Sequence, residues 1–276
     1  MILVLEQYLN SDILEPLFLC GDSCKILKTL PDGCIDMVMT SPPYWGKREY
    51  ENVESIGLEK DPHEYIANLM SIFCELHRVL KPTGSFWLNI GDSYVCKSLL
   101  GLPWRVAIRM CDKQGWILRN SIIWNKVKGA PDNSLDKLRN VHENLFHFVK
   151  SKKYYYDVAM ARKAPLKAKV RNGAVISATG ITGVRYKRQI ELSTVLTDEQ
   201  KESAFAELNG ILEQIKNGEI ADFRMIIKGQ QRTTHSDSTK ISGRAKELET
   251  KGFYFLKYHP DGAKLSDVWD IIPEDT

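Results

Sequence analysis

Residues 41–45 read Ser-Pro-Pro-Tyr-Trp and place a hydroxyl group beside two rigid prolines and two aromatic rings. Pro42 and Pro43 each fix their own φ and bias the preceding residue towards an extended backbone. The Oγ of Ser41 and the carbonyl of Pro42 are therefore predicted to be two neighbouring hydrogen-bond acceptors, with the ring of Tyr44 close by. Such a loop is suited to holding a flat group that carries two N–H donors.

The exocyclic amine of cytosine or adenine is such a group. It is a poor nucleophile because its lone pair is delocalised into the ring, and two acceptors at its N–H groups would favour the tetrahedral geometry that it needs to react. Tyr44 would stack on the base, which must be flipped out of a duplex to reach the loop. Methyl transfer from a sulfonium donor then needs alignment more than a strong base. The alternative interpretation is a plain turn whose aromatic residues cover the core, since short motifs also occur by chance.

An apolar, β-prone run over residues 35–40 leads into this loop and predicts a buried strand. Open α/β sheets place ligands at the carboxyl ends of their strands. A second predicted strand, over residues 17–22, ends in Asp22, and a third, over residues 85–90, is followed by Asp92. Asp22 either faces the site or caps the helix that is predicted to start at Ser23, and the sequence leaves both interpretations open.

Helices are predicted after Asp61-Pro62 and at Pro103, and further strands over residues 116–124 and 144–149. This alternation predicts a mostly parallel α/β sheet covered on both faces, and residues 1–160 are interpreted as a catalytic core. Residues 161–252 are predicted to be a loop-rich insert, with a helix after Thr197 and a polar loop over 229–243 that is disordered or ordered by DNA. Residues 253–276 are expected to return to the core.

Positive charge is concentrated at the start of the insert. Residues 150–190 carry eleven Lys and Arg against one acid, a local net of +10 in a chain whose overall charge is +3. Polyanion contact is therefore expected there. The candidate DNA-binding residues are Arg171, Arg185, Lys187, Arg188 and Arg232, and the alternative for any one of them is a solvated surface charge.

The cysteine and apolar patterns exclude other classes. Six cysteines lie within the first 111 residues without a C-x-x-C pair or clustered histidines, so we expect buried free thiols and no metal site. No apolar run approaches the roughly 20 residues needed to cross a bilayer, and no basic leader is visible. A cytoplasmic protein without membrane contact is expected.

The loop and its surroundings resemble the amino-methyltransferases of DNA restriction–modification systems, in the permuted order in which the catalytic loop precedes the cofactor loop. The resemblance covers about 140 residues. Its segments follow one another in the family's order: Gly-Asp-Ser at 21–23, Thr-Ser-Pro-Pro-Tyr-Trp at 40–45, Gly-Leu-Glu-Lys at 57–60, Leu-Lys-Pro-Thr-Gly at 80–84, Asn-Ile-Gly-Asp-Ser at 89–93, Gly-Leu-Pro-Trp-Arg at 101–105, Trp-Asn-Lys at 124–126, His-Glu-Asn at 142–144 and Tyr-Tyr-Asp at 155–157.

The resemblance implies S-adenosylmethionine as methyl donor, double-stranded DNA as substrate and a cognate restriction endonuclease in the same system. It places Asp22 near the adenine of the cofactor, with Ser41 also at the cofactor, and gives the basic insert the position of a target-recognition region. Serine at the first loop position favours N4 of cytosine, whereas N6 of adenine is the closest rival. An RNA or protein amino-methyltransferase fits less well, because the insert is large and basic.

One family feature is not found in the sequence, the D-P-F-x-G-x-G-T loop whose glycines let the backbone approach the cofactor. We therefore expect an S-adenosylmethionine-dependent, Rossmann-like sheet that is incomplete, with a gap between the strands ending at Asp22 and Ser41. The chain would then be a truncated or split methyltransferase that a second polypeptide completes. A subunit that binds DNA and performs no chemistry by itself is the alternative.

Overall fold

The computed structural model describes residues 7–9, 11, 15–47, 56–129, 132–229 and 243–273. These divide into two compact units, which are described separately. Unit 1 comprises Met1–Tyr156 and Ser266–Thr276, and unit 2 comprises Asp157–Leu265.

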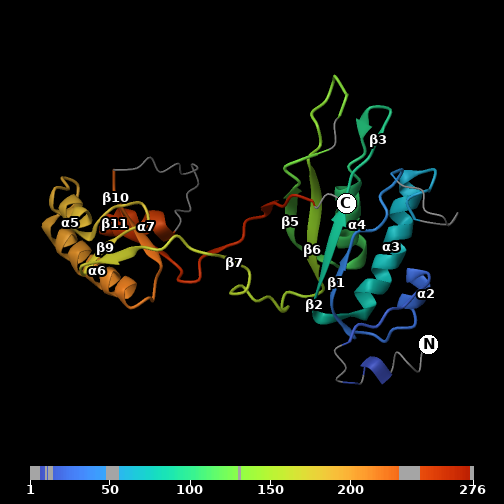
Figure 1. Cartoon of the computed structure of the whole chain (residues 1–276), viewed down its shortest axis with the longest axis horizontal. Coiled ribbons are helices and arrows are strands. Elements are labelled where there is room, and N and C mark those ends of the chain that lie inside the picture. Colours follow the sequence, from blue (N-terminus) through green and yellow to red (C-terminus); the bar gives the residue numbers. More distant parts are fainter. Residues whose placement is uncertain are drawn as a thin grey trace. The chain divides into compact units, whose positions relative to one another are not determined.

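Unit 1 is built on a five-stranded sheet in the order β1-β2-β6-β5-β13 (Figure 1). The strands are β1 (Ile35–Thr40), β2 (Leu80–Ile90), β5 (Ile117–Asn125), β6 (His142–Val149) and β13 (Val268–Asp270). β1 is parallel to β2 and β13 is parallel to β5, whereas β6 is antiparallel to both of its neighbours. The sheet is therefore mixed, and every strand except β6 runs in the same direction. The predicted α/β class is confirmed.

Helices cover one face of this sheet and enclose the core of unit 1. The long helices are α3 (Pro62–Val79) and α4 (Leu102–Gln114), and a short helix, α2 (Ser23–Leu27), precedes β1. Phe86 of β2 lies at the centre of the core, 5.3 Å from the ring centroids of both Phe73 and Trp116. Burying each such ring contributes about 2 to 3 kcal/mol. A hairpin of β3 (Tyr94–Val95) and β4 (Ser98–Leu99) links β2 to α4.

Stacked aromatic rings cover the opposite face. The ring of His147 on β6 lies parallel to Trp87 on β2 with centroids 4.2 Å apart, and Tyr154 and Tyr156 approach it from the following segment. His147 is only 1% exposed, and its Nε2 has no hydrogen-bond partner among the described residues. Burial, and to a smaller extent the charge of Arg119, lowers the pKa of His147 to about 4. The imidazole is therefore neutral at physiological pH.

Acid is expected to destabilise unit 1 through this histidine. In the unfolded chain this histidine binds a proton near pH 6.5, and in the folded chain it does so only near pH 4. As the pH is lowered through this range, the free energy of unfolding should decrease by about 3 kcal/mol. His147→Phe keeps a flat ring and removes the titration, so its free energy of unfolding should fall less between pH 7 and pH 4.5. Tryptophan fluorescence in urea measures this for unit 1 alone, because all six tryptophans lie there. An equal fall in both proteins would contradict the assignment.

Strand β1 forms one edge of the sheet. Among the described residues it pairs only with β2, and its Met37 and Met39 are 56% and 65% exposed. The strand predicted over residues 17–22 is not formed: residues 16–20 have no regular structure, and Phe18 is 87% exposed. A strand needs a hydrogen-bonding neighbour, and no strand of the described chain lies on that side of β1.

Unit 2 has a hydrophobic core of its own. Its elements are β7 (Arg162–Lys163), β8 (Lys169–Arg171), β9 (Ala174–Ile176), α5 (Gly183–Glu191), α6 (Asp198–Lys216), β10 (Asp222–Ile227), α7 (Gly243–Lys251), β11 (Phe253–Tyr258) and β12 (Ala263–Lys264). Tyr186, Ile190, Leu208, Phe223 and Phe253 are fully or almost fully buried together. The insert is therefore a folded unit and not a collection of loops, because apolar residues of α5, α6 and the β10-β11 pair pack together.

The boundaries of the units differ from the predicted ones. Residues 253–258 were expected to return to the core of unit 1, but they form β11, which pairs antiparallel with β10 inside unit 2. The chain returns to unit 1 only at Ser266, where β13 joins β5. The pairing of all six residues of β11 with β10 cannot be read from the aromatic pattern alone. Most of the predicted mobile loop over 229–243 lies outside the described residues.

Candidate active site

Four polar residues meet at the edge of the unit 1 sheet where loop 41–44 lies. Ser41 follows β1, Asn89 lies near the end of β2, Lys126 follows β5, and Glu143 is the second residue of β6. Because β6 runs opposite to β1, β2 and β5, its beginning lies beside their ends. Residues up to 102 positions apart in sequence are thereby brought to one place.

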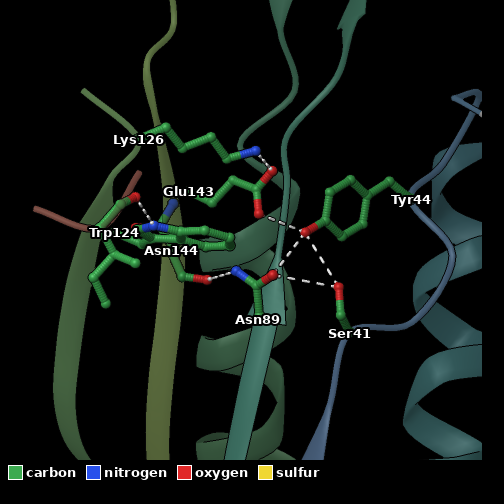
Figure 2. A network of polar contacts seen from close by, with 8 residues as sticks. Ser41, Tyr44, Asn89, Trp124, Lys126, Glu143 and Asn144 are labelled. Carbon is green, nitrogen blue, oxygen red and sulfur yellow. Dashed lines mark hydrogen bonds and ion pairs between the residues drawn. The ribbon is translucent and has the colours of Figure 1, made fainter. Parts of the chain in front are cut away.

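The hydroxyl of Tyr44 is the centre of the resulting polar network (Figure 2). It donates to Oε2 of Glu143 at 2.7 Å and lies 2.9 Å from Oδ1 of Asn89. Oγ of Ser41 is 3.3 Å from both the Tyr44 hydroxyl and Oδ1 of Asn89. Lys126 forms an ion pair with Oε1 of Glu143. The sticks in Figure 2 show all five side chains converging from the loop and three strands.

Hydrogen bonds from neighbouring elements hold the loop. Tyr65 of α3 donates its hydroxyl to the carbonyl of Pro43 at 3.0 Å. The indole N–H of Trp45 donates to the carbonyl of Glu59 at 2.8 Å, and Ser93 Oγ donates to the carbonyl of Trp45 at 2.7 Å. No hydrogen bond among the described residues uses the carbonyl of Pro42. The carbonyls of Pro43 and Trp45 therefore accept hydrogen bonds that hold the loop. The carbonyl of Pro42 remains available to accept a hydrogen bond from a ligand.

Gly91 allows the ring of Tyr44 to take its position. A Cβ at residue 91 would lie 2.6 Å from Cε2 of Tyr44, a separation that no side chain tolerates. Burial raises the pKa of Tyr44 well above its ordinary value; the hydrogen bond from Ser41 opposes this, whereas the hydrogen bond to Glu143 and the charge of Glu143 reinforce it. The hydroxyl thus remains protonated at neutral pH and can act as a donor.

A cavity of about 390 Å³ opens beside the network. It is lined by Ser41, Pro42, Pro43, Tyr44, Lys47, Asn89, Trp124, Lys126 and Glu143. Its volume lies within the range of small-ligand pockets, and its walls combine aromatic rings with a few convergent polar groups. All four predicted catalytic residues, Ser41, Pro42, Pro43 and Tyr44, line this one cavity.

Asp22 lies apart from that lining. It is the N-cap of α2, and its Oδ1 accepts a hydrogen bond from the backbone N–H of Lys25 at 2.8 Å. The capping interpretation of Asp22 is thus realised in the structure. Its predicted second role at a cofactor stays a prediction.

The predicted DNA-binding residues lie on two elements of unit 2. Arg185, Lys187 and Arg188 belong to α5, whose other side packs Tyr186 and Ile190 into the core, and Arg171 is exposed at the end of β8. Arg232 lies outside the described residues. We call Arg185, Lys187 and Arg188 the α5 basic face.

Unit 2 holds a second basic region that the sequence did not single out. A cavity of about 1100 Å³ is lined by five cationic side chains together with one acid, Asp222, and several apolar and aromatic residues. The cations are Arg162, Lys163, Arg224, Lys257 and Lys264. They come from β7, β10, β11 and β12, so their proximity depends on the tertiary fold.

Asn89, Lys126 and Glu143 were not predicted as site residues. Each belongs to a segment that resembles the amino-methyltransferases and lies at the end of a predicted strand. This position at a strand end could have indicated them as site residues. Within the described chain no group of three His, Cys, Asp or Glu residues could hold a metal ion. No described helix has the length and apolarity required to cross a bilayer.

Comparison with known proteins identifies similar sequences. A family model described as DNA methylase, of the N6 and N4 type, matches residues 35–274. The type II methyltransferase M.XycI of Xanthomonas campestris pv. cyanopsidis is 39% identical over 172 residues, 52% of this chain and 57% of that protein. M.SmaI of Serratia marcescens is 36% identical over 181 residues, 55% of this chain and 62% of that protein.

A solved structure, the PvuII DNA methyltransferase described as cytosine-N4-specific, is 28% identical and covers 50% of each chain with a TM-score of 0.43. The chain thus spans little more than half the length of the curated relatives it matches.

Proposed function

Because this chain belongs to the DNA methylase family, we propose that unit 1 binds a flipped cytosine and presents its N4 amine for methylation by S-adenosylmethionine. The observation that supports this most directly is the cavity lined by Ser41, Pro42, Asn89 and Tyr44, in which Ser41 Oγ and Asn89 Oδ1 lie 3.3 Å apart beside the Tyr44 hydroxyl. Acceptors placed in this way match the two N–H groups of an amine.

The chemical role of these groups follows from the electronic structure of the amine. Two acceptors draw the N–H bonds out of the ring plane and return the lone pair to nitrogen, where it can attack an electrophilic methyl group. The bound donor would supply that methyl group. Tyr44 and Trp124 line the cavity, and stacking of their rings on the base would offset part of the cost of flipping it.

Nucleoside analysis of methylated DNA tests the choice of base. We expect N4-methylcytosine, since Ser41 is the first residue of the loop. N6-methyladenine as the product would overturn the cytosine assignment and leave the amino-methyltransferase function intact. A cognate restriction endonuclease that cuts the same site is the proposed partner in the cell, and unmethylated duplex containing the site is its substrate.

Unit 2 is proposed to bind the DNA backbone. Replacing Arg185 and Arg188 together with alanine should weaken duplex binding about tenfold and reduce the slope of log K against log salt by about two, because each lost phosphate contact lowers that slope by about one. Fluorescence anisotropy at several salt concentrations measures both quantities.

The matched control removes two cations that acids on the same helix already neutralise. Lys216 pairs with Glu213 and Lys251 with Glu247, so Lys216→Ala with Lys251→Ala should change neither affinity nor slope. If the two double variants behave alike, the α5 basic face does not contact DNA.

Fewer residues of this chain are assigned to binding S-adenosylmethionine than to binding the base. Asp22, the one residue assigned to the cofactor alone, uses a carboxylate oxygen to cap α2. Among the described residues β1 pairs on one side only, and its Met37 and Met39 side chains are exposed. These residues do not by themselves form a cradle for a nucleoside and a methionine chain. We propose that a second polypeptide pairs with the open edge of β1 and supplies the glycine-rich loop.

A DNA-binding subunit without chemistry is the second candidate function, and the basic character of unit 2 is the observation that favours it. It predicts salt-sensitive DNA binding that Ser41→Ala leaves unchanged, and no methyl transfer even after a completing polypeptide is added. Methyl transfer by the complemented chain would exclude it.

A further inference from the structure

Glu143 and Lys126 form the polar wall of the unit 1 cavity. Their side chains are 15% and 29% exposed, and the ammonium contacts Oε1 of the carboxylate. The other oxygen, Oε2, accepts the hydroxyl proton of Tyr44 at 2.7 Å. A largely buried carboxylate is therefore held in one orientation, with one oxygen on a cation and the other on the residue at the end of the catalytic loop.

The number of hydrogens fixes the direction of these bonds. The Tyr44 hydroxyl carries one proton, and the carboxylate is its strongest acceptor, because hydrogen bonds to ionised groups are shorter and stronger than neutral ones. With that proton directed to Glu143, the oxygen of Tyr44 is free to accept from Ser41 Oγ, 3.3 Å away. Oδ1 of Asn89 and the lone pairs of Ser41 then remain as acceptors that line the cavity.

We propose that Glu143 is the final acceptor of the proton that the target amine loses, and that Ser41 and Tyr44 relay it. The proposal rests on the function proposed above. Three oxygens in a row, Ser41 Oγ, Tyr44 Oη and Glu143 Oε2, connect the acceptor loop to the buried carboxylate with separations of 3.3 and 2.7 Å. Lys126 is a positioning residue that keeps Oε2 turned towards Tyr44.

The proton and electron balance is complete with a sulfonium methyl donor. When the amine nitrogen forms its new bond to carbon, the carbon–sulfur bond breaks and the nitrogen becomes cationic. One N–H bond then breaks and its electron pair returns to nitrogen. The proton goes to Ser41 Oγ as the Ser41 proton moves to Tyr44 Oη and the Tyr44 proton moves to Glu143 Oε2, which leaves a neutral carboxylic acid.

The acidity of the methylated amine drives this step. A methylated amine cation attached to a pyrimidine has lost the delocalisation of its lone pair and is a strong acid, so a weak carboxylate base accepts its proton. The partial exposure of both side chains gives water access to the carboxyl group, so that the proton can pass to solvent. The carboxylate is thereby restored for the next cycle.

Chemical rescue tests the relay in the methyl-transferring complex of this chain. Glu143→Gln should lower the single-turnover rate of methyl transfer about a hundredfold, within the range for loss of a general base, with DNA affinity unchanged. Glu143→Ala should be similarly slow and should recover rate in formate, a small carboxylate that can occupy the vacated space. Formamide, which has the same shape without basicity, should not restore it. Glu64→Gln, an exposed acid of α3, is the matched control.

A second measurement needs no methyl transfer. Burial is the main cause of the raised pKa of Tyr44, and Glu143 adds to it through its hydrogen bond and charge. Carbon-13 NMR of labelled tyrosines, assigned with Tyr44→Phe, should therefore show that Glu143→Gln lowers the pKa of Tyr44. The proposal is overturned if Glu143→Gln transfers methyl groups within threefold of the native rate, or if formate and formamide have equal effects. Absence of methyl transfer by the native complex would instead contradict the proposed function.

Discussion

Replacing Ser41 with alanine is expected to slow methyl transfer by a factor of about one hundred to one thousand, the usual effect of removing one preorganised hydrogen-bonding group at a reacting centre. The substitution removes an acceptor for the amine and the first oxygen of the proposed relay. Ser41 is exposed and its two hydrogen bonds are long, at 3.3 Å, so the fold should lose little stability. The rate of transfer and not the affinity for DNA should change.

Single-turnover transfer of a labelled methyl group, with the duplex affinity measured in parallel, checks this expectation. Ser71→Ala is a suitable control, since Ser71 is an exposed serine of α3 whose hydroxyl bonds only to the carbonyl of Ala67 at 3.1 Å. A Ser41→Ala variant that retained more than a third of the native rate would show that the loop hydroxyl does not act on the amine.

The second large effect is a gain of cofactor binding when another polypeptide pairs with the free edge of β1. The chain alone is expected not to bind S-adenosylmethionine at micromolar concentration, and to gain this binding when a polypeptide carrying a strand and the D-P-F-x-G-x-G-T loop is added. The glycines of such a loop allow the backbone to approach the cofactor closely, and its strand would satisfy the unpaired edge. Burying Met37 and Met39 would contribute about 2 kcal/mol each.

A double variant tests complex formation without changing the stability of the isolated chain. Met37→Lys with Met39→Lys should leave the unfolding of the isolated chain nearly unchanged, because both side chains are exposed in it. Complex formation should be lost, since burying two ammonium groups without partners costs several kcal/mol for each. Calorimetry with S-adenosylmethionine and size-exclusion chromatography measure the two properties, and Met160→Lys, at an exposed methionine of unit 2, is the control. Micromolar cofactor binding by the chain alone would refute the proposal.

Local sequence signals were sufficient for several elements. Asp61 caps α3 by accepting from the N–H of His63, with Pro62 at the first helical position, as the sequence predicts. Thr197 and Gln200 form a capping box at the start of α6. In each case the stabilising contact joins residues within one helical turn, so the information lies in neighbouring letters of the sequence.

Other expectations depended on distant partners and were not fulfilled. Residues 17–22 have strand-like composition, yet they form no strand, because a strand requires a neighbour and the described part of the chain has none on that side of β1. Residues 162–190 have few large apolar side chains, yet Tyr186 of this stretch meets Phe223 of β10 at 4.7 Å in the core of unit 2. Composition describes a segment but does not say which segment it pairs with.

The composition of loop 41–44 could be interpreted without any knowledge of the fold. Ser41, the two prolines and Tyr44 are consecutive, and proline geometry acts on adjacent residues, so their shared place in one cavity was predictable. The residues that this loop faces depend on how the strands are ordered in the sheet. Asn89, Lys126 and Glu143 reach it because β6 runs antiparallel between β2 and β5, a choice of strand order made by long-range packing of the core. The carboxylate that receives the Tyr44 hydroxyl is 99 residues away in the sequence and 2.7 Å away in the fold.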